Sequence, residues 1–486
     1  MRLGDLLVRA KLVTEEQVAK ALDVQALKGG RLGDHLVAAG VLTRAALDAF
    51  LHRMPVEPAN VAATGLEVND LLSLLMKLIY KSRLESVRQF VEAIKLPSLV
   101  VMEVVRMAVD RKLLYTSGMR NSESSMDMNY ALTEEGRRWT LDALQLNRYA
   151  GPAPVTLEEF THQVNLQKLS NELVTFERIR ESIRDLSFED SFIEQTGPAL
   201  NSGRAILLYG PPGNGKTSVA LRLANAFNDV IYMPYAVIVD GQIITVHDAR
   251  IHAALHVTPL NDEKMNALIR RTDYDARWVP CKRPFVVAGG ELTMEMLDLR
   301  YDESSHLYEA PLHMKALGGC FVIDDFGRQL LSPVTMLNRW IVPLESRVDF
   351  LKLHTGNSFS IPFDELVIFS TNLEPDDLMD PALLRRIPYK IRIGAPSLEL
   401  YKRIFLMECE THKLTLTDEM FDGIVRRVSR EKGLELAAFH PKFILDQVVA
   451  SCRFVGKPVQ LEPKFVEYAI DNLAVKRDTP KTVIAA

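Results

Sequence analysis

The stretch Gly210-Pro-Pro-Gly-Asn-Gly-Lys-Thr217 follows an apolar run at 205–209 and precedes a helical pattern at 217–228. It matches the pattern G-x-x-x-x-G-K-[ST] in full, in the strand–loop–helix setting that this pattern requires. Glycines let backbone N–H groups turn inward around phosphate oxygens, and a lysine at this position reaches the β and γ phosphates. The stretch therefore predicts a phosphate-binding loop at the edge of a parallel α/β sheet. Further strands of this sheet are expected at 231–233, 320–323, 366–370 and 389–393, and a separate β-hairpin is expected at 235–246 with its turn at Asp240-Gly241.

The whole loop is assigned to ATP binding, since each residue contributes a backbone N–H group or a side chain to such a turn. The Thr217 hydroxyl is also a candidate Mg²⁺ ligand. A chance glycine-rich turn is the alternative, and the flanking strand and helix argue against it. The residues assigned to ATP are Gly210, Pro211, Pro212, Gly213, Asn214, Gly215, Lys216, Thr217 and Ser218.

A second stretch, Cys320-Phe-Val-Ile-Asp-Asp325, indicates a buried strand that ends in two carboxylates. Acidic residues at the carboxyl end of a parallel strand lie where α/β proteins place their sites. Asp324 is predicted to hold Mg²⁺, and Asp325 to orient an attacking water. Taken alone, the same residues could be a solvated strand end.

With both motifs in place, about residues 165–480 resemble the AAA+ ATPase superfamily. The resemblance implies that Asn372, at the end of the strand 367–372, is the sensor-1 residue that contacts the γ-phosphate or the water. It also implies an arginine finger at Arg385 or Arg386, of which Arg386 fits the motif better. Lys442 stands where the family has its sensor-2 residue.

Two features place the chain more closely within that superfamily. The stretch 349–362 indicates a β-hairpin before the sensor-1 strand, similar to the pre-sensor-1 hairpin branch that includes MoxR-type and MCM-type ATPases. A plain surface hairpin is the alternative. Most members carry Glu after the Mg²⁺-binding Asp, whereas this chain has the shorter Asp325. A nucleotide switch or scaffold that does not hydrolyse ATP therefore stays open as a function.

The N-terminus carries an internal repeat, because Arg2-Leu3-Gly4-Asp5 returns 29 positions later as Arg31-Leu32-Gly33-Asp34. Each copy predicts a short helix, a turn, and a longer helix capped by Thr14 or Thr43. Two such helical hairpins are expected to pack as one small domain.

This repeat resembles the MshEN class, the N-terminal domain of type II secretion and type IV pilus ATPases that binds cyclic di-GMP. The arginines would donate to phosphate or guanine, and the leucines would form an apolar bed for purines. A helical docking domain without a ligand is the alternative. The residues assigned to cyclic di-GMP are Arg2, Leu3, Gly4, Leu7, Leu22, Gln25, Arg31, Leu32, Gly33, Leu36 and Leu51.

Residues 66–150 predict three helices, a two-stranded ribbon with a polar tip, and one more helix, which is the winged-helix pattern. Between Leu66 and Arg148 there are 12 Lys and Arg residues against 11 Asp and Glu residues. A DNA reader normally shows a basic stripe, so a module that contacts protein is favoured over one that contacts DNA.

The chain as a whole predicts a multidomain fold. Its 486 residues exceed one core, and the net charge of −5 argues against a mainly electrostatic nucleic-acid binder. Four scattered cysteines indicate a reducing compartment, and no apolar run is long enough for a membrane span. The expected parts are a sensor at 1–54, a winged-helix-like module at 66–150, an AAA+ core at 160–395 and a helical lid at 396–486.

Together these patterns predict a cytoplasmic bacterial ATPase that assembles with itself as a ring, expected to be a hexamer. Cyclic di-GMP would regulate it, and its output would be remodelling of an unidentified protein client. A winged-helix DNA-binding regulator that uses ATP as an assembly switch is the alternative from another class.

Overall fold

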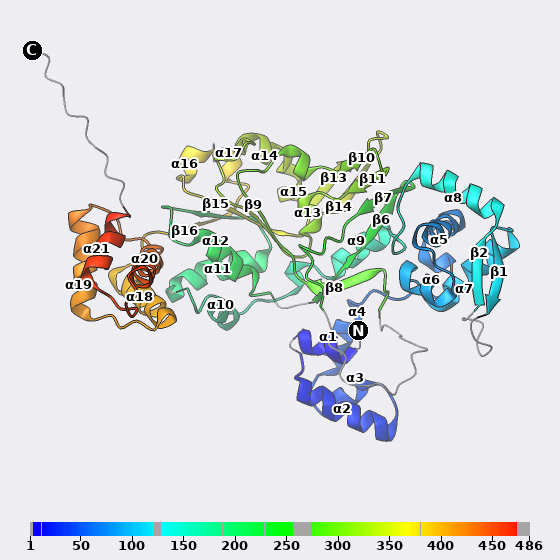
Figure 1. Cartoon of the computed structure of the whole chain (residues 1–486), viewed down its shortest axis with the longest axis horizontal. Coiled ribbons are helices and arrows are strands. Elements are labelled where there is room, and N and C mark those ends of the chain that lie inside the picture. Colours follow the sequence, from blue (N-terminus) through cyan, green and yellow to red (C-terminus); the bar gives the residue numbers. More distant parts are fainter. Residues whose placement is uncertain are drawn as a thin grey trace, which may run out of the picture. The chain divides into compact units, whose positions relative to one another are not determined.

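The computed structural model describes residues 3–10, 12–119, 128–186, 188–227, 230–255, 274–379 and 381–473. The chain divides into two compact units. Figure 1 shows the helices and strands of the chain. Unit 1 comprises Met1–Leu173, Phe227–Phe321 and Gln329–Val367, and unit 2 comprises Val174–Ala226, Val322–Arg328 and Ile368–Ala486.

Unit 1 begins with the repeat, which folds as two helical hairpins: α1 (Leu3–Arg9), α2 (Glu15–Lys28), α3 (Leu32–Ala38) and α4 (Arg44–His52). Both predicted caps are confirmed, since Thr14 accepts the N–H of Gln17 and Thr43 accepts that of Ala46. The two long helices therefore begin where the sequence predicted.

The next segment of unit 1 has the predicted order of helices and ribbon, and the ribbon tip at 120–127 lies outside the described residues. Its apolar core includes Val61 from the preceding linker and Ala236 from a later hairpin. The elements are η1 (Ala62–Thr64), α5 (Val68–Ser82), α6 (Val87–Ile94), α7 (Ser98–Asp110), β1 (Leu114–Met119), β2 (Met128–Leu132) and α8 (Glu134–Leu146).

A mixed sheet with the strand order β10-β11-β7-β6-β3 forms the middle of unit 1. Its hairpin turns at Asp240-Gly241, as predicted, and both residues have positive φ, +49° and +73°. That conformation suits the tight turn whose twist matches the flanking strands. The strands are β3 (Val155–Thr156), β6 (Ala236–Val239), β7 (Gln242–Thr245), β10 (Arg300–Asp302) and β11 (Leu307–Glu309).

One interpretation of the sequence was wrong about a strand's place. The run 231–233 was expected in the parallel sheet, but β5 (Val230–Pro234) pairs antiparallel with β8 (Trp278–Lys282) in a separate two-stranded sheet. The parallel sheet instead uses β9 (Phe285–Ala288), which the sequence analysis missed. A short apolar run does not reveal its partner, because pairing is decided by distant residues.

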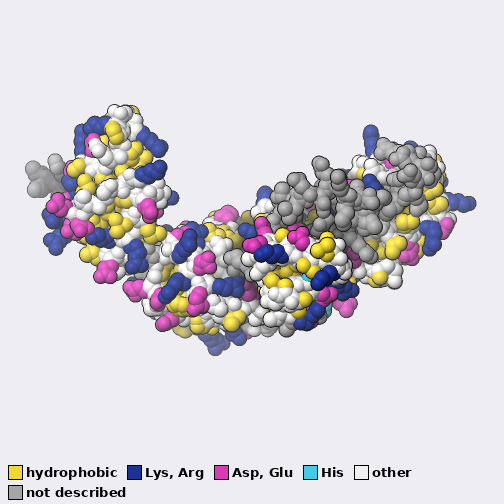
Figure 2. Space-filling model, turned by 90° about the horizontal axis from the view of Figure 1, so that it is seen from below, with side chains coloured by type: hydrophobic (Ala, Val, Ile, Leu, Met, Phe, Trp, Pro, Cys, Tyr) yellow, Lys and Arg dark blue, Asp and Glu magenta, His cyan; other side chains and the backbone are white. Residues whose placement is uncertain are grey.

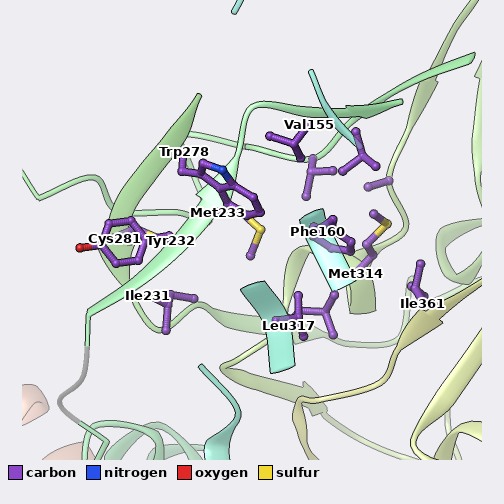
Figure 3. Close-up of a cluster of buried hydrophobic side chains, with 14 of the residues drawn as sticks. Val155, Phe160, Ile231, Tyr232, Met233, Trp278, Cys281, Met314, Leu317 and Ile361 are labelled. Carbon is purple, nitrogen blue, oxygen red and sulfur yellow. The ribbon is translucent and has the colours of Figure 1, made fainter. Parts of the chain in front are cut away.

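The main core of unit 1 surrounds these strands. Trp278 and Tyr232 on β8 and β5 lie in the same cluster as Phe160 on α9 (Leu157–Leu166) and Met314 on α13 (Leu312–Lys315) (Figure 3). Leu6, Ala10 and Met54 of the N-terminal helical segment belong to this cluster as well. The N-terminal segment is therefore anchored in the core of unit 1.

A buried guanidinium ties this core to the surrounding segments. The Arg277 side chain is 1% exposed and forms ion pairs with Asp275 at 2.8 Å and Glu159 at 2.9 Å. It also donates to the backbone oxygens of Thr64 and Pro154. A buried charge needs partners of this kind, because leaving it unpaired in the interior is costly.

The remaining elements of unit 1 include the predicted hairpin, β13 (Val348–Lys352) with β14 (Ser358–Pro362). Asp349 anchors its base, since it accepts from Arg339 at 2.6 Å and faces His313 at 2.8 Å. The other elements are η3 (Leu169–Asn171), η4 (Met294–Leu297), α14 (Pro333–Arg339) and α15 (Ile341–Ser346).

The elements that lie wholly in unit 2 belong to the parallel sheet and the C-terminal helices. They are α10 (Phe176–Ser182), α11 (Asp190–Ser202), β4 (Ile206–Tyr209), α12 (Lys216–Ala224), α16 (Pro375–Leu378), α17 (Pro381–Leu384), β16 (Tyr389–Arg392), α18 (Leu398–His412), α19 (Asp418–Arg426), the π-helical turn η5 (Arg427–Glu431), α20 (His440–Phe454) and α21 (Pro463–Asp471). The helices after residue 397 enclose their own apolar core, which includes Tyr401, Phe421 and Ile444. The sequence analysis predicted this all-helical end.

A buried carboxyl group precedes the strand β15 (Leu366–Thr371). Glu365 is 0% exposed, and neither of its carboxyl oxygens has a hydrogen-bond partner among the described residues. Burial raises its pKa well above the usual range, against a lowering effect of Arg347. The group therefore favours the neutral, protonated form in the folded chain.

We predict that Glu365→Gln stabilises the chain at pH 8. The Glu365 carboxyl keeps its proton to a higher pH in the folded chain than in the unfolded chain. Its contribution to the free energy of unfolding is therefore fully present below its pKa in the unfolded chain, and it is lost as pH rises through the raised pKa of the folded chain. Glutamine cannot ionise, so the melting temperature should rise by roughly 2 °C or more at pH 8, with a smaller difference near pH 4.

The exposed Glu303→Gln serves as the matched control and should show no such pH-dependent difference. Thermal unfolding monitored at both pH values measures the effect. A Glu365→Gln variant that melts below the parent at pH 8 would contradict the prediction.

Candidate nucleotide-binding site

The strand order brings the chemistry-bearing residues together. The parallel sheet runs β16-β4-β15-β12-β9, so β15 lies between β4 and β12 (Cys320–Ile323). β15 and β16 both pair with β4 in parallel register. Because parallel strands end at one edge, the loop after β4, the carboxylates after β12 and Asn372 after β15 meet there.

The loop after β4 adopts a backbone that requires glycine. Gly210 has a φ of +134°, and a Cβ on it would lie 2.3 Å from the backbone oxygen of Ile393. The Lys216 Nζ donates to the oxygens of Gly210 at 2.9 Å and Pro211 at 3.0 Å, and to Asn372 Oδ1 at 2.7 Å. The lysine is thus held inside the loop, within reach of a phosphate bound there.

The electrostatics of Lys216 fit this place. Burial lowers its pKa, while the carboxylates of Asp324 and Asp325 raise it. Thr217, the second residue of α12, lies beside Lys216, and its Oγ1 donates to Asp324 Oδ2 at 2.9 Å. A hydroxyl and a carboxylate in contact are oxygen ligands of the kind that Mg²⁺ takes beside a nucleotide's phosphates. Thr217 and Asp324 therefore fit a Mg²⁺ ion.

Asp325 has an unusual backbone that explains its residue type. Its φ is +50°, in the left-handed region where Asp and Asn are several-fold enriched. The turn is held on both sides, since Phe326 N–H donates to the Ser370 oxygen at 2.7 Å and Thr371 Oγ1 donates to the Phe326 oxygen at 2.7 Å. A short acidic side chain at 325 suits this conformation better than glutamate does.

The exposed carboxylate of Asp325 is oriented by its neighbour. Asn372 Nδ2 donates to Asp325 Oδ1 at 3.0 Å, while Asn372 Oδ1 accepts from Lys216. The single amide of Asn372 therefore joins the lysine to the second carboxylate. The structure brings together Lys216, Thr217, Asp324, Asp325 and Asn372, as the sequence analysis expected.

Further predicted residues of this site are exposed or half-buried. Arg385 is exposed and Arg386 is half-buried, both directly after α17, while Asp380 lies outside the described residues. Pro212 and Ser218 are exposed, and Lys442 is exposed in the first turn of α20. Their proposed roles stay predictions.

The C-terminal helices contact the loop through residues that the sequence analysis missed. Phe439 N–H donates to the Gly213 oxygen at 3.0 Å, and Ala438 N–H donates to Asn214 Oδ1 at 3.0 Å. Three of these four contact atoms belong to the backbone, which any residue supplies. The sequence therefore carried no signal for them.

The N-terminal repeat shows what its glycines do in the fold. A Cβ on Gly4 would lie 2.7 Å from Val18, and one on Gly33 would lie 2.7 Å from Leu47, the equivalent residue of the second copy. Close helix packing thus accounts for both glycines.

The other residues assigned to cyclic di-GMP fall into three groups. Leu7 and Leu36 are buried in the core of the repeat. Leu3, Leu22, Leu32 and Gln25 are partly exposed, and the Gln25 amide donates to the Gly30 oxygen at 2.8 Å. Arg31 and Leu51 are exposed, and Arg2 lies outside the described residues.

Comparisons with known proteins concern parts of the chain. Residues 397–472 match a family described as "Domain of unknown function (DUF8689)". The chain is 31% identical over 124 residues to AAA-ATPase At4g25835 of Arabidopsis thaliana, which is 26% of this chain. It spans 23% of that relative's length, so the match concerns a segment of both proteins. A segment of the chain is thus similar to part of an AAA-ATPase, and the geometry of the site fits a bound nucleotide.

Solved structures with some similarity include a mutant of Thermotoga maritima RuvB, with 13% identity, a TM-score of 0.32 and coverage of 63% of this chain and 73% of that one. NtrX from Brucella abortus has 12% identity, a TM-score of 0.36 and coverage of 62% and 60%. Among the described residues, no helix is long and apolar enough to cross a membrane.

We predict that Lys216→Ala abolishes ATP binding, because it removes the charge that faces the β and γ phosphates. Asp324→Asn should retain nucleotide binding and lose the dependence on Mg²⁺, since a neutral amide is a poorer cation ligand. Calorimetry with ATP, with and without Mg²⁺, measures both. Lys464→Ala, an exposed lysine on α21, is the control. If Lys216→Ala binds ATP as tightly as the parent, the loop is not the site.

Proposed function

We propose that the chain is an ATPase of the AAA+ type that binds ATP·Mg²⁺ at the loop after β4. One observation carries this proposal: hydrogen bonds connect Lys216, Asn372 and Asp325, and a further hydrogen bond connects Thr217 with Asp324. These five side chains would supply a cation that faces the phosphates, two ligands for Mg²⁺ and two groups that position the attacking water. Bound Mg²⁺ would supply charge stabilisation at the phosphates.

In this proposal hydrolysis depends on Asp325 and Asn372. Asp325 accepts a proton from the attacking water, and Asn372 keeps the carboxylate in place through its Nδ2. The left-handed backbone at 325 sets the direction in which the shorter side chain leaves the turn. A direct turnover assay decides between hydrolysis and the alternative of a nucleotide switch that does not hydrolyse ATP.

The proposed active form is a homo-oligomeric ring, expected to be a hexamer, in which Arg386 of one subunit reaches the ATP of the next. An arginine suits this role because its planar, permanently charged fork stabilises phosphoryl oxygens across an interface. The helices after 397 would act as a lid. The hairpin β13–β14, whose Phe350 is 60% exposed, would face a client in the MoxR- and MCM-like manner.

Arg386→Ala should lower turnover by about 10³-fold or more, the scale of an arginine finger, with the ATP affinity of the monomer nearly unchanged. Arg385→Ala is the paired variant, and a larger loss there would transfer the role to Arg385. Mixing Arg386→Ala with Asp324→Asn subunits should restore part of the activity, because intact half-sites meet at one interface. No recovery under conditions that exchange subunits would contradict a finger acting between subunits.

The proposed regulatory ligand is cyclic di-GMP, bound by the N-terminal repeat. The support is the repeated Arg-Leu-Gly motif and the exposure of Arg31 at the start of α3, where a ligand has access. Cyclic di-GMP would change ring assembly or hydrolysis only if its affinity for the more active state of the chain differs from its affinity for the less active state.

Arg31→Ala should weaken cyclic di-GMP binding by about 1.5–3 kcal/mol, because it removes charged hydrogen bonds. The full chain is used, since Leu6, Ala10 and Met54 of the repeat segment are buried in the core of unit 1. Arg44→Ala, an exposed arginine of the same segment outside the motif, is the control and should bind as the parent does. Cyclic di-GMP binding no tighter than GTP binding would leave a helical docking domain instead.

A protein client is proposed in preference to DNA as the partner of the winged-helix-like module. Glu103 on α7, the presumed recognition helix, accepts the backbone N–H of Val61 at 3.5 Å, so the linker contacts this helix. On the face drawn in Figure 2, basic and acidic side chains are intermingled over the described residues. A salt-dependent shift of duplex DNA would instead favour the DNA-binding alternative.

The compartment proposed is the cytoplasm. All four cysteines are free and buried, and the thiols of Cys281, Cys320, Cys409 and Cys452 form no disulfide. Unpaired thiols are typical of a reducing compartment.

A further inference from the structure

The contact between the loop and the helix α20 has a defined construction, all of it within unit 2. Ala438 and Phe439 meet Asn214 and Gly213 through the two hydrogen bonds described above, each 3.0 Å long. The Phe439 ring covers Gly213, since a Cβ on this glycine would lie 2.3 Å from the ring. We call the two hydrogen bonds and the ring contact the loop latch.

The turn that carries the latch is fixed to the helices behind it. Ala437 N–H donates to His440 Nδ1 at 3.2 Å, and the His440 side chain is buried against Tyr401 of α18, with the ring centroids 6.3 Å apart. Burial lowers the pKa of His440, which agrees with an unprotonated Nδ1 as acceptor. The turn 437–440 is therefore held against α18 as well as α20.

Asn214 itself has an unused donor. The residue is 5% exposed, its Oδ1 accepts from Ala438, and its Nδ2 has no hydrogen-bond partner among the described residues. A buried amide N–H group without a partner is unfavourable. The group lies in a loop whose other donors suit phosphate, so an anionic oxygen bound there would satisfy it.

We propose that Asn214 is a positioning residue that bridges the nucleotide and the C-terminal helices. Its Oδ1 holds the turn 437–440, and its Nδ2 donates to a phosphate oxygen of the bound nucleotide. The loop latch thereby couples occupancy of the loop to the position of α20. This inference rests on the proposed nucleotide binding and specifies which residue conveys it.

Asn214→Asp separates the two roles, because aspartate keeps an acceptor for Ala438 and loses the donor. In the full chain, its affinity for ATP·Mg²⁺ by calorimetry should fall about tenfold or more. Hydrogen exchange of residues 437–445 without nucleotide should stay as in the parent. Asn225→Asp, an exposed residue at the end of α12 that gains the same charge, is the matched control and should bind as the parent does.

Asn214→Ala should lose both properties, with weaker ATP binding and faster exchange of 437–445. Phe439→Ala should mainly raise exchange, with ATP affinity changed less than about threefold. Phe454→Ala, on the same helix but 91% exposed, should change neither. Circular dichroism of each variant establishes that it is folded.

Two results would overturn the proposal: Asn214→Asp binding ATP as tightly as the parent, or Asn214→Ala leaving exchange of 437–445 unchanged. If the parent chain binds no ATP, the proposed function fails and the donor role of Asn214 fails with it. The exchange measurement without nucleotide then still decides whether Asn214 holds the helices.

Discussion

The candidate site depends on the position of strand β15 between β4 and β12. This order separates the phosphate-binding loop from the carboxylates by one strand, and it places Asn372 where its amide reaches both Lys216 and Asp325. If β4 and β12 were direct neighbours, Asn372 at the end of β15 would not lie between them. Every function proposed for the nucleotide site follows from this one arrangement of parallel strands.

In unit 1 the constraint is of a different kind, because the positive charge of Arg277 is buried and needs partners. Arg277 can stay inside only because Asp275, Glu159 and two backbone oxygens surround it, and those groups come from segments far apart in the sequence. The unit is therefore organised around a polar centre as well as an apolar one. The carboxyl group of Glu365 shows the opposite case, because burial with no hydrogen-bond partner in the described part of the chain favours its neutral form.

The sequence predicted the features that local patterns encode. The loop, the two acids, the Asp240-Gly241 turn, the Thr14 and Thr43 caps and the C-terminal helices all depend on neighbouring residues. It did not predict the antiparallel partner of β5 or the strand β9, because distant segments decide those pairings. Nor could it predict that Ala438 and Phe439 contact the loop through backbone N–H groups, since a backbone contact leaves no mark in residue types.

The sheet register also has a consequence for synthesis on the ribosome. Ile206 of the loop-bearing strand pairs with Ile368 and Tyr389, so β4 emerges long before either neighbour exists. The strands β15 and β16, which pair with β4, are synthesised only after the intervening chain, much of which belongs to unit 1. The nucleotide site is thus a late product of translation, and a nascent chain that stops before β15 has a phosphate-binding motif but no site.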